Sequence, residues 1–150
     1  MTKLQGEYQP SPVRWVREQV ETYERTGGRE ANTLLDTGLP IIILTTRGPK
    51  SGNIRKSPLM RVEHGGEYAL VASMGGAPMN PRWYGNLKAN PSEVTIQDGP
   101  EPFAVDVREL DGAERSAWWE RAVAAYPPYA EYQTRTQRVI PVFLARRRDS

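Results

Sequence analysis

Cysteine is absent from the sequence, and histidine occurs only once, at position 64. Without cysteine the chain forms no disulfide and carries no thiolate nucleophile. A single histidine argues against a Ser-His-Asp system, and against zinc or non-haem iron sites, which normally take two or more histidine or cysteine ligands. We therefore expect no metal site. An enzyme built on this chain needs an organic cofactor for its difficult step.

Long apolar runs and nucleotide-binding glycine motifs are also missing. No apolar stretch is long enough to cross a membrane, and the first residues lack the hydrophobic segment of a signal peptide, so we expect a cytoplasmic protein. The pattern G-x-G-x-x-G does not occur. The segment Gly48-Pro49-Lys50-Ser51 lacks the glycines of a P-loop and continues into a predicted strand rather than a helix.

Acidic residues are missing from one central stretch of the chain. The 150 residues carry a net charge of only +2, which does not suit a general binder of polyanions, and we expect no nucleic-acid partner. Between Asp36 and Glu63, however, all the charged side chains are basic: Arg47, Lys50, Arg55, Lys56 and Arg61. This stretch creates a local positive field in a near-neutral protein.

The hydrophobic periodicity predicts one compact domain of strands and helices. Residues 1–38 would form an amphipathic helix and a linker, the helix beginning at Ser11-Pro12 and ending at Gly27-Gly28. Residues 39–150 would form the main domain. Strands are predicted at residues 39–46, 55–63, 68–73, 94–97, 103–110 and 139–144, and short helices at 80–88, 111–126 and 129–136.

The connections between these strands resemble hairpins rather than βαβ crossovers, for example at His64-Gly65-Gly66. The fold class is therefore mainly β with helices (α+β), an antiparallel barrel of about six strands. Asp111 and Glu114 are spaced as a capping box for the helix that follows. The basic residues 146–148 are expected to be a solvated tail.

The turn from Arg47 to Arg55 has the composition of an anion-binding site. Its glycines, Gly48 and Gly52, would let backbone N–H groups approach an anion, and Ser51 adds a hydroxyl donor. Lys50 supplies charge, and an arginine such as Arg55 can bind phosphate through two parallel hydrogen bonds. A solvated hairpin with ordinary surface charges explains the same residues, and the sequence leaves both readings open.

Two further segments carry flat or small side chains that suit a ring-shaped ligand. Ser73 is followed by Met74 and two glycines at the end of a predicted strand, which would allow a ring to lie against the backbone. Trp83, Tyr84 and Asn86 fall on one short helix and could stack on a ligand and hydrogen-bond to it. A plain loop and ordinary core packing are the alternatives.

Three phenols recur at three-residue spacing near the C-terminus: Tyr126, Tyr129 and Tyr132. In a helix the last two share a face, so the row could contact an aromatic substrate and donate a hydrogen bond to a developing oxyanion. The same row could instead be an aromatic cluster that seals the end of the barrel.

Four blocks of the chain together resemble one known family. They are residues 44–59 (L-T-T-R-G-P-K-S-G-N-I-R-K-S-P-L), 72–91 (A-S-M-G-G-A-P-M-N-P-R-W-Y-G-N-L-K-A-N-P), 126–132 (Y-P-P-Y-A-E-Y) and 138–142 (R-V-I-P-V). In order and spacing they are similar to the deazaflavin-dependent nitroreductases of actinobacteria, which use reduced coenzyme F420. The resemblance implies a split β-barrel of the flavin-reductase and pyridoxamine-oxidase type.

The resemblance also implies roles for individual residues. Ser73, Tyr126, Tyr129 and Tyr132 would form the catalytic, substrate-facing group. The cofactor would be held by Pro49, Lys50, Ser51, Arg55, Lys56, Ser57, Pro58, Leu59, Met60, Ala72, Ser73, Met74, Trp83, Tyr84 and Asn86. Relatives commonly carry basic residues where this chain has Met74 and Pro49. The basic stretch would face the anionic oligoglutamate tail of F420.

The expected function is that of an F420H2-dependent reductase. It would transfer a hydride from the reduced deazaflavin to an electron-poor acceptor: a quinone such as menaquinone, a nitroaromatic or an unsaturated lactone. An FMN-dependent split-barrel oxidoreductase and a non-catalytic protein that binds F420 or nucleic acid are the alternatives. The first helix, with Trp15 beside Arg14 and Arg17, could rest on a membrane surface or pack on the barrel.

Overall fold

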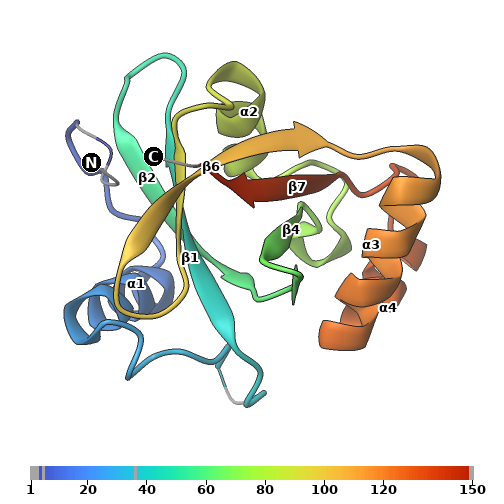
Figure 1. Cartoon of the computed structure of the whole chain (residues 1–150), viewed down its shortest axis with the longest axis horizontal. Helices are drawn as coiled ribbons and strands as arrows, with labels where there is room; N and C mark the ends of the chain where they lie inside the picture. The colour runs from blue at the N-terminus through green and yellow to red at the C-terminus, as the bar shows by residue number, and fades with distance from the viewer. Residues whose placement is uncertain (1–3, 5, 36, 149–150) are drawn as a thin grey trace.

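The computed structural model describes residue 4 and residues 6–35 and 37–148, which form a curled sheet with helices packed on it (Figure 1). Seven strands and four helices are described. In chain order the elements are α1 (Arg14–Thr26), β1 (Ile41–Arg47), β2 (Ile54–Met60), β3 (Glu63–His64), β4 (Glu67–Val71), the 3₁₀ turn η1 (Met74–Gly76), α2 (Arg82–Ala89), β5 (Val94–Gln97), β6 (Pro102–Glu109), α3 (Gly112–Ala125), α4 (Pro128–Thr134) and β7 (Val142–Arg147).

The strands form one sheet in the order β2-β1-β5-β6-β7-β4-β3, and every neighbouring pair is antiparallel. Because the sheet curls, an ionic network can join segments that lie far apart in this order. The guanidinium of Arg61, which follows β2, donates to both carboxylate oxygens of Asp98 at 3.0 and 2.9 Å. Tyr68 of β4 donates its hydroxyl to the same carboxylate at 2.6 Å. The predicted α+β barrel of antiparallel strands is confirmed.

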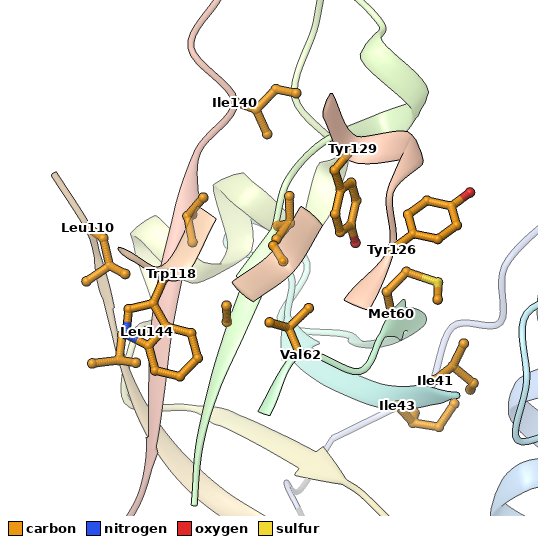
Figure 2. Close-up of a cluster of buried hydrophobic side chains, with 14 of the residues drawn as sticks. Ile41, Ile43, Met60, Val62, Leu110, Trp118, Tyr126, Tyr129, Ile140 and Leu144 are labelled. Carbon is orange, nitrogen blue, oxygen red and sulfur yellow. The ribbon is translucent and has the colours of Figure 1, made fainter. Parts of the chain in front are cut away.

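The two faces of the sheet bury different side chains, as the alternation of a strand requires. Ile42 and Leu44 of β1 pack in one cluster with Trp83 of α2. Ile41 and Ile43 pack on the opposite face, in a cluster that α1, α3 and α4 cover. In Figure 2, Tyr126, Tyr129 and Met60 lie at one end of this second cluster, while Leu110, Leu144 and Trp118 lie at the other.

The first helix packs on the sheet through its buried residues Val20 and Tyr23, and α1 contacts β2. Trp15 remains 44% exposed near the start of the helix. Among the described residues, no helix is both long enough and apolar enough to span a membrane. Packing of the first helix on the barrel is thus confirmed. A contact of its exposed end with a membrane surface stays a prediction.

The helix ends were predicted better than the side chains that cap them. Gly27 adopts a left-handed conformation (φ +62°) and ends α1 as expected. Helix α3 begins after Asp111, but the predicted capping box is wrong because no side chain caps it. Glu114 instead receives two hydrogen bonds from Arg108 of β6, at 2.8 and 2.6 Å. The predicted cap at Ser11 is also wrong, since α1 begins at Arg14.

Two predicted strands, 55–63 and 139–144, differ from the observed strands by three residues or more at an end, and the others by at most two. The expected strand 55–63 is divided into β2 and β3, because the chain changes partners in between. The Arg61 amide donates to the carbonyl of Pro40, just before β1, while the Val62 carbonyl accepts from the amide of Ala69 in β4. The basic residues 146–148 are exposed, as predicted, but they are not a tail beyond the last strand, which was predicted to end at 144 and extends from 142 to 147. Strand β7 includes Arg146, whose guanidinium pairs with Glu67 at 2.8 Å.

Candidate functional site

A cavity of about 410 Å³ brings together segments that are distant in the sequence. It lies between the start of α1, the β1–β2 turn, strand β2, the turn η1 and the start of α2. Its wall contains nine of the predicted cofactor residues, which come from two of the four family blocks, 44–59 and 72–91. These are Pro49, Lys50, Ser51, Arg55, Lys56, Ser57, Met74, Trp83 and Asn86, and the wall is completed by Gln9, Ser11, Val16, Gly48, Pro81 and Arg82.

The β1–β2 turn holds its own shape through backbone hydrogen bonds. The Gly48 amide donates to Asn53 at 2.8 Å, and the Gly52 amide donates to Gly48 at 3.0 Å. Gly52 has a φ of +73°, which favours glycine. Both glycine amides are thus used within the turn, and the binding of an anion by other backbone N–H groups of the turn stays a prediction. The Ser51 hydroxyl oxygen accepts from the Asn53 amide at 3.1 Å, which leaves its O–H group able to donate.

The side chains, rather than the backbone, make this cavity positive. No aspartate or glutamate of the described residues lines it. Lys50, Arg55 and Arg82 line it, and none of the three forms an ion pair with a residue in the described part of the chain. Three cations that no carboxylate neutralises favour a bound anion.

The fourth cation of the wall, Lys56, is already neutralised. Its ammonium lies 2.6 Å from a carboxylate oxygen of Glu24 on α1, and 4.8 Å from the ring centre of Tyr8. Lys56 therefore adds less positive potential to the cavity than an unpaired lysine at the same place would. Arg47, the first residue of the predicted basic turn, pairs with Glu93 at 3.1 Å and donates to the Gly52 carbonyl at 2.8 Å, so it supports the turn.

A larger cavity, of about 570 Å³, also borders Lys56 but has a different charge. Two carboxylates line it, those of Glu24 and Glu101, against this single cation. Thr45, Thr95 and Gln97 supply further polar lining. The charges of the two walls therefore favour the smaller cavity for an anionic ligand, although its volume is lower.

Helix α2 presents two fixed, buried side chains to the smaller cavity. Trp83 and Asn86 are each 7% exposed and line its wall. The Asn86 amide nitrogen donates to the Thr46 hydroxyl at 3.0 Å, which ties the helix to β1. Tyr84, by contrast, points elsewhere: its hydroxyl reaches Glu109 at 3.3 Å, and it does not line the cavity.

The segment from Ala72 to Gly76 is tightly constrained beside the cavity. Met74, Gly75 and Gly76 all have positive φ values, of +46°, +64° and +82°. A Cβ on Gly76 would lie 2.7 Å from the Tyr132 carbonyl oxygen, so glycine is required where the segment meets α4. Met74 lines the cavity and is 51% exposed, whereas Ala72 and Ser73 are buried and lie outside its wall.

The three predicted phenols gather in one cluster at the ends of α3 and α4. The hydroxyls of Tyr126 and Tyr132 lie 3.0 Å apart, and the ring centres of Tyr126 and Tyr129 are 5.0 Å apart. Burial, aided by the Tyr132 hydrogen bond, raises the pKa of Tyr126 to about 12. Burial also raises the pKa of Tyr129, whose hydroxyl forms no hydrogen bond with a described residue.

The phenols do not line either of these two cavities, and Tyr126 and Tyr129 pack with Met60 in the core cluster of Figure 2. The sealing aromatic cluster is therefore what the structure shows, and their contact with substrate stays a prediction. Pro58, Leu59 and Met60 continue β2 away from the cavity, in register with β1. The described residues contain no group of three or more histidine, aspartate or glutamate side chains that could hold a metal ion.

Several wall residues escaped prediction. Arg82 follows Asn80-Pro81, a typical helix start, so its place beside Trp83 could have been anticipated. Gln9, Ser11 and Val16 reach the wall from about 40 residues away in sequence, with no local pattern that marks them.

Comparison with known proteins decides the family. The model of the F420H(2)-dependent quinone reductase family matches residues 15–147. The chain belongs to this family. An F420H(2)-dependent quinone reductase of Mycobacterium tuberculosis strain H37Rv is 36% identical over 129 residues, which cover 84% of this chain and 85% of that protein. The expected family resemblance is confirmed. The chain is therefore an oxidoreductase, and its cofactor is coenzyme F420.

Solved structures agree with this assignment. A structure of an F420-H2 dependent reductase (FDR-A) is 58% identical, with a TM-score of 0.67, and covers 71% of this chain and 93% of that one. A domain-swapped dimer is 54% identical, with a TM-score of 0.69, and covers 90% and 99%. A heme binding protein from Mycobacterium smegmatis, 19% identical with a TM-score of 0.56 over 83% of this chain and 50% of that one, shares the fold alone.

Proposed function

We propose that the chain reduces a quinone with F420H2, and that the 410 Å³ cavity holds the cofactor with its anionic tail against Lys50, Arg55 and Arg82. The observation that carries this proposal is the set of three cations, without an ion-pair partner among the described residues, in a wall free of carboxylates. Nitroaromatics and unsaturated lactones are further acceptors that we propose for the same site.

The chemistry of the wall fits this cofactor. A phosphate and a glutamate tail need cationic donors, and the guanidinium of Arg55 can bind a phosphate through two parallel hydrogen bonds. The O–H group of Ser51 is available as a further donor. The flat ring of F420 needs apolar and planar contacts, which Trp83 and Met74 offer from the same wall. The cavity volume lies within the usual range for cofactor sites.

Bound F420H2 supplies a hydride, and a quinone becomes a hydroquinone by gaining one hydride and one proton. The protein must therefore steady negative charge on the acceptor oxygen until the proton arrives. A phenol whose pKa is raised, such as Tyr126, stays protonated at neutral pH and can donate a hydrogen bond to that oxygen. We assign the donation of this hydrogen bond to the phenol cluster together with the Ser73 hydroxyl. The buried rings around them would exclude water.

The first test is direct. Purified protein is mixed with reduced F420 and menadione, and oxidation of the cofactor is followed by its absorbance. We expect oxidation well above the enzyme-free rate. No oxidation above that rate with menadione, a nitroaromatic or an unsaturated lactone would contradict the proposed activity.

A second test locates the cofactor. Arg55→Gln removes one of the cations without an ion pair and should raise the Kd for F420 about 10- to 150-fold, since a hydrogen bond to a charged group contributes about 1.5–3 kcal/mol. Arg146→Gln is the matched control, because Arg146 lies on β7 outside the cavity and pairs with Glu67. Equal Kd values for the two variants would place the anionic tail elsewhere. Titration with FMN in place of F420 tests the alternative flavin cofactor.

A further inference from the structure

One arginine outside the cavity wall organises the segment that contributes Met74 to it. The guanidinium of Arg138 donates four hydrogen bonds to residues 72–80. Its Nε reaches the Ala77 carbonyl at 2.9 Å, and its Nη2 reaches the Ser73 carbonyl at 2.8 Å. Its Nη1 reaches the Ala72 carbonyl at 3.1 Å and the Asn80 side-chain oxygen at 2.7 Å. Four of its five N–H groups are thus used on one segment.

This segment needs such an anchor because its backbone is unusual. Three consecutive residues, from Met74 to Gly76, have positive φ values, and a methionine in that conformation is disfavoured. Helix α4 contacts the segment on one side, where Gly76 meets Tyr132. Arg138 binds both ends of the segment, before and after the left-handed residues. Its hydrogen bonds oppose relaxation of the strained backbone.

We propose that Arg138 is a positioning residue for the F420 site: it holds residues 72–80 in the conformation that places Met74 in the cavity wall and Ser73 beside it. This inference rests on the proposed function, because it assigns Arg138 an effect on the cofactor in that cavity. Arg138 itself does not line the cavity. It acts through the backbone that it binds.

The contacts require arginine rather than any cation. Lysine has three donors on a single nitrogen, whereas these four acceptors are distributed around a planar fork. Among the described residues, Arg138 forms no ion pair with a carboxylate, so its charge is balanced only by carbonyl and amide dipoles. Arg138→Lys should therefore keep the positive charge but no longer hold residues 72–80 in their conformation.

Arg115 provides a matched control. It is also partly buried, it donates to one backbone carbonyl, that of Ile140, at 2.6 Å, and it forms no ion pair with a described residue. Burial lowers the pKa of both guanidinium groups. Arg115 does not contact residues 72–80, so Arg115→Lys reproduces the loss of a buried arginine contact without touching the segment.

The experiment measures three properties of each variant. They are the thermal midpoint, the hydrogen exchange of amides 74–80 in the cofactor-free protein, and the Kd for oxidised F420 from its fluorescence. We expect Arg138→Lys to accelerate exchange in 74–80 and to raise the Kd about tenfold or more, because small displacements of a positioned group have large effects. Arg115→Lys should lower the thermal midpoint without either change. Millimolar guanidinium should partly restore F420 binding to Arg138→Ala.

Several results would overturn the inference. If Arg138→Lys changes the Kd no more than Arg115→Lys, or if exchange in 74–80 is unchanged, Arg138 does not position this segment for the cofactor. A variant that only loses thermal stability, and that guanidinium does not rescue, marks a structural role alone. Wild-type protein that binds no F420 would overturn the proposed function, and the exchange rates would then decide by themselves whether Arg138 holds the segment.

Discussion

Replacing Glu24 by glutamine should destabilise the fold and yet strengthen F420 binding. The Glu24 carboxylate lies 2.6 Å from the ammonium of Lys56, and the two side chains are 30% and 15% exposed. Lys56 lines the proposed cofactor cavity. Glutamine has nearly the same size as glutamate and keeps one acceptor oxygen, but it removes the charge that neutralises this lysine.

The two effects can be estimated from the burial of the pair. Exposed ion pairs contribute up to about 1 kcal/mol, and breaking a buried pair costs about 3–5 kcal/mol. Intermediate burial places the expected loss at about 1–2 kcal/mol, or a decrease of roughly 2–8 °C in Tm for a chain of this size. The released charge faces an anion across a hydrated cavity, where it contributes about 1 kcal/mol, or a roughly fivefold lower Kd.

The assay combines thermal unfolding with a fluorescence titration of F420 at low ionic strength. Glu18→Gln is the control, because Glu18 lies on the same helix and pairs with Arg14 in an exposed position, at 82% and 57% exposure for Arg14 and Glu18. This control should change neither quantity appreciably. An unchanged or higher Kd for Glu24→Gln would refute the electrostatic reasoning, whatever happens to its stability.

Three further predictions test separate parts of the site. Gly76→Ala should lower the free energy of unfolding by about 1–3 kcal/mol more than Gly75→Ala in chemical denaturation, because its Cβ would lie 2.7 Å from the Tyr132 carbonyl oxygen whereas Gly75 has open space. Asn86→Asp places a carboxylate in the cavity wall and should weaken F420 binding several-fold, with a smaller effect at high salt, as titrations at two ionic strengths would show. Because the pKa of Tyr126 is raised from 10.0 to about 12, the neutral phenol contributes stability that is complete below pH 10 and is lost as the pH rises toward 12. Tyr126→Phe should show a smaller decrease in stability over that interval when unfolding is measured against pH.

Local patterns were sufficient to predict most elements of the fold. The β-branched run that begins near Ile41 formed a buried strand, as predicted, and the glycine pair Gly65-Gly66 formed a hairpin turn. These signals work because each depends on neighbouring residues and on the conformational freedom of glycine. Much of the cavity was predictable for the same reason, since the β1–β2 turn and the start of α2 carry their own composition.

Long-range pairings could not be predicted from the sequence. Nothing near Lys56 indicates that Glu24 neutralises it, because that contact depends on where α1 packs on the sheet. The same holds for Arg138, whose role emerges only when the chain between β6 and β7 returns to residues 72–80. Glu114 is the opposite case. Its spacing from Asp111 suits a capping box, but its carboxylate accepts hydrogen bonds from Arg108 of β6 and does not cap the helix.

The most direct test of the account compares F420 with its deazaflavin chromophore lacking the phosphate and glutamate tail. Equilibrium titration of the wild-type protein should give a markedly lower Kd for F420 than for the chromophore, and Arg55→Gln should remove much of that difference. The same preference in wild type and in variants of Arg55, Lys50 and Arg82 would contradict the claim that this cavity holds the anionic tail.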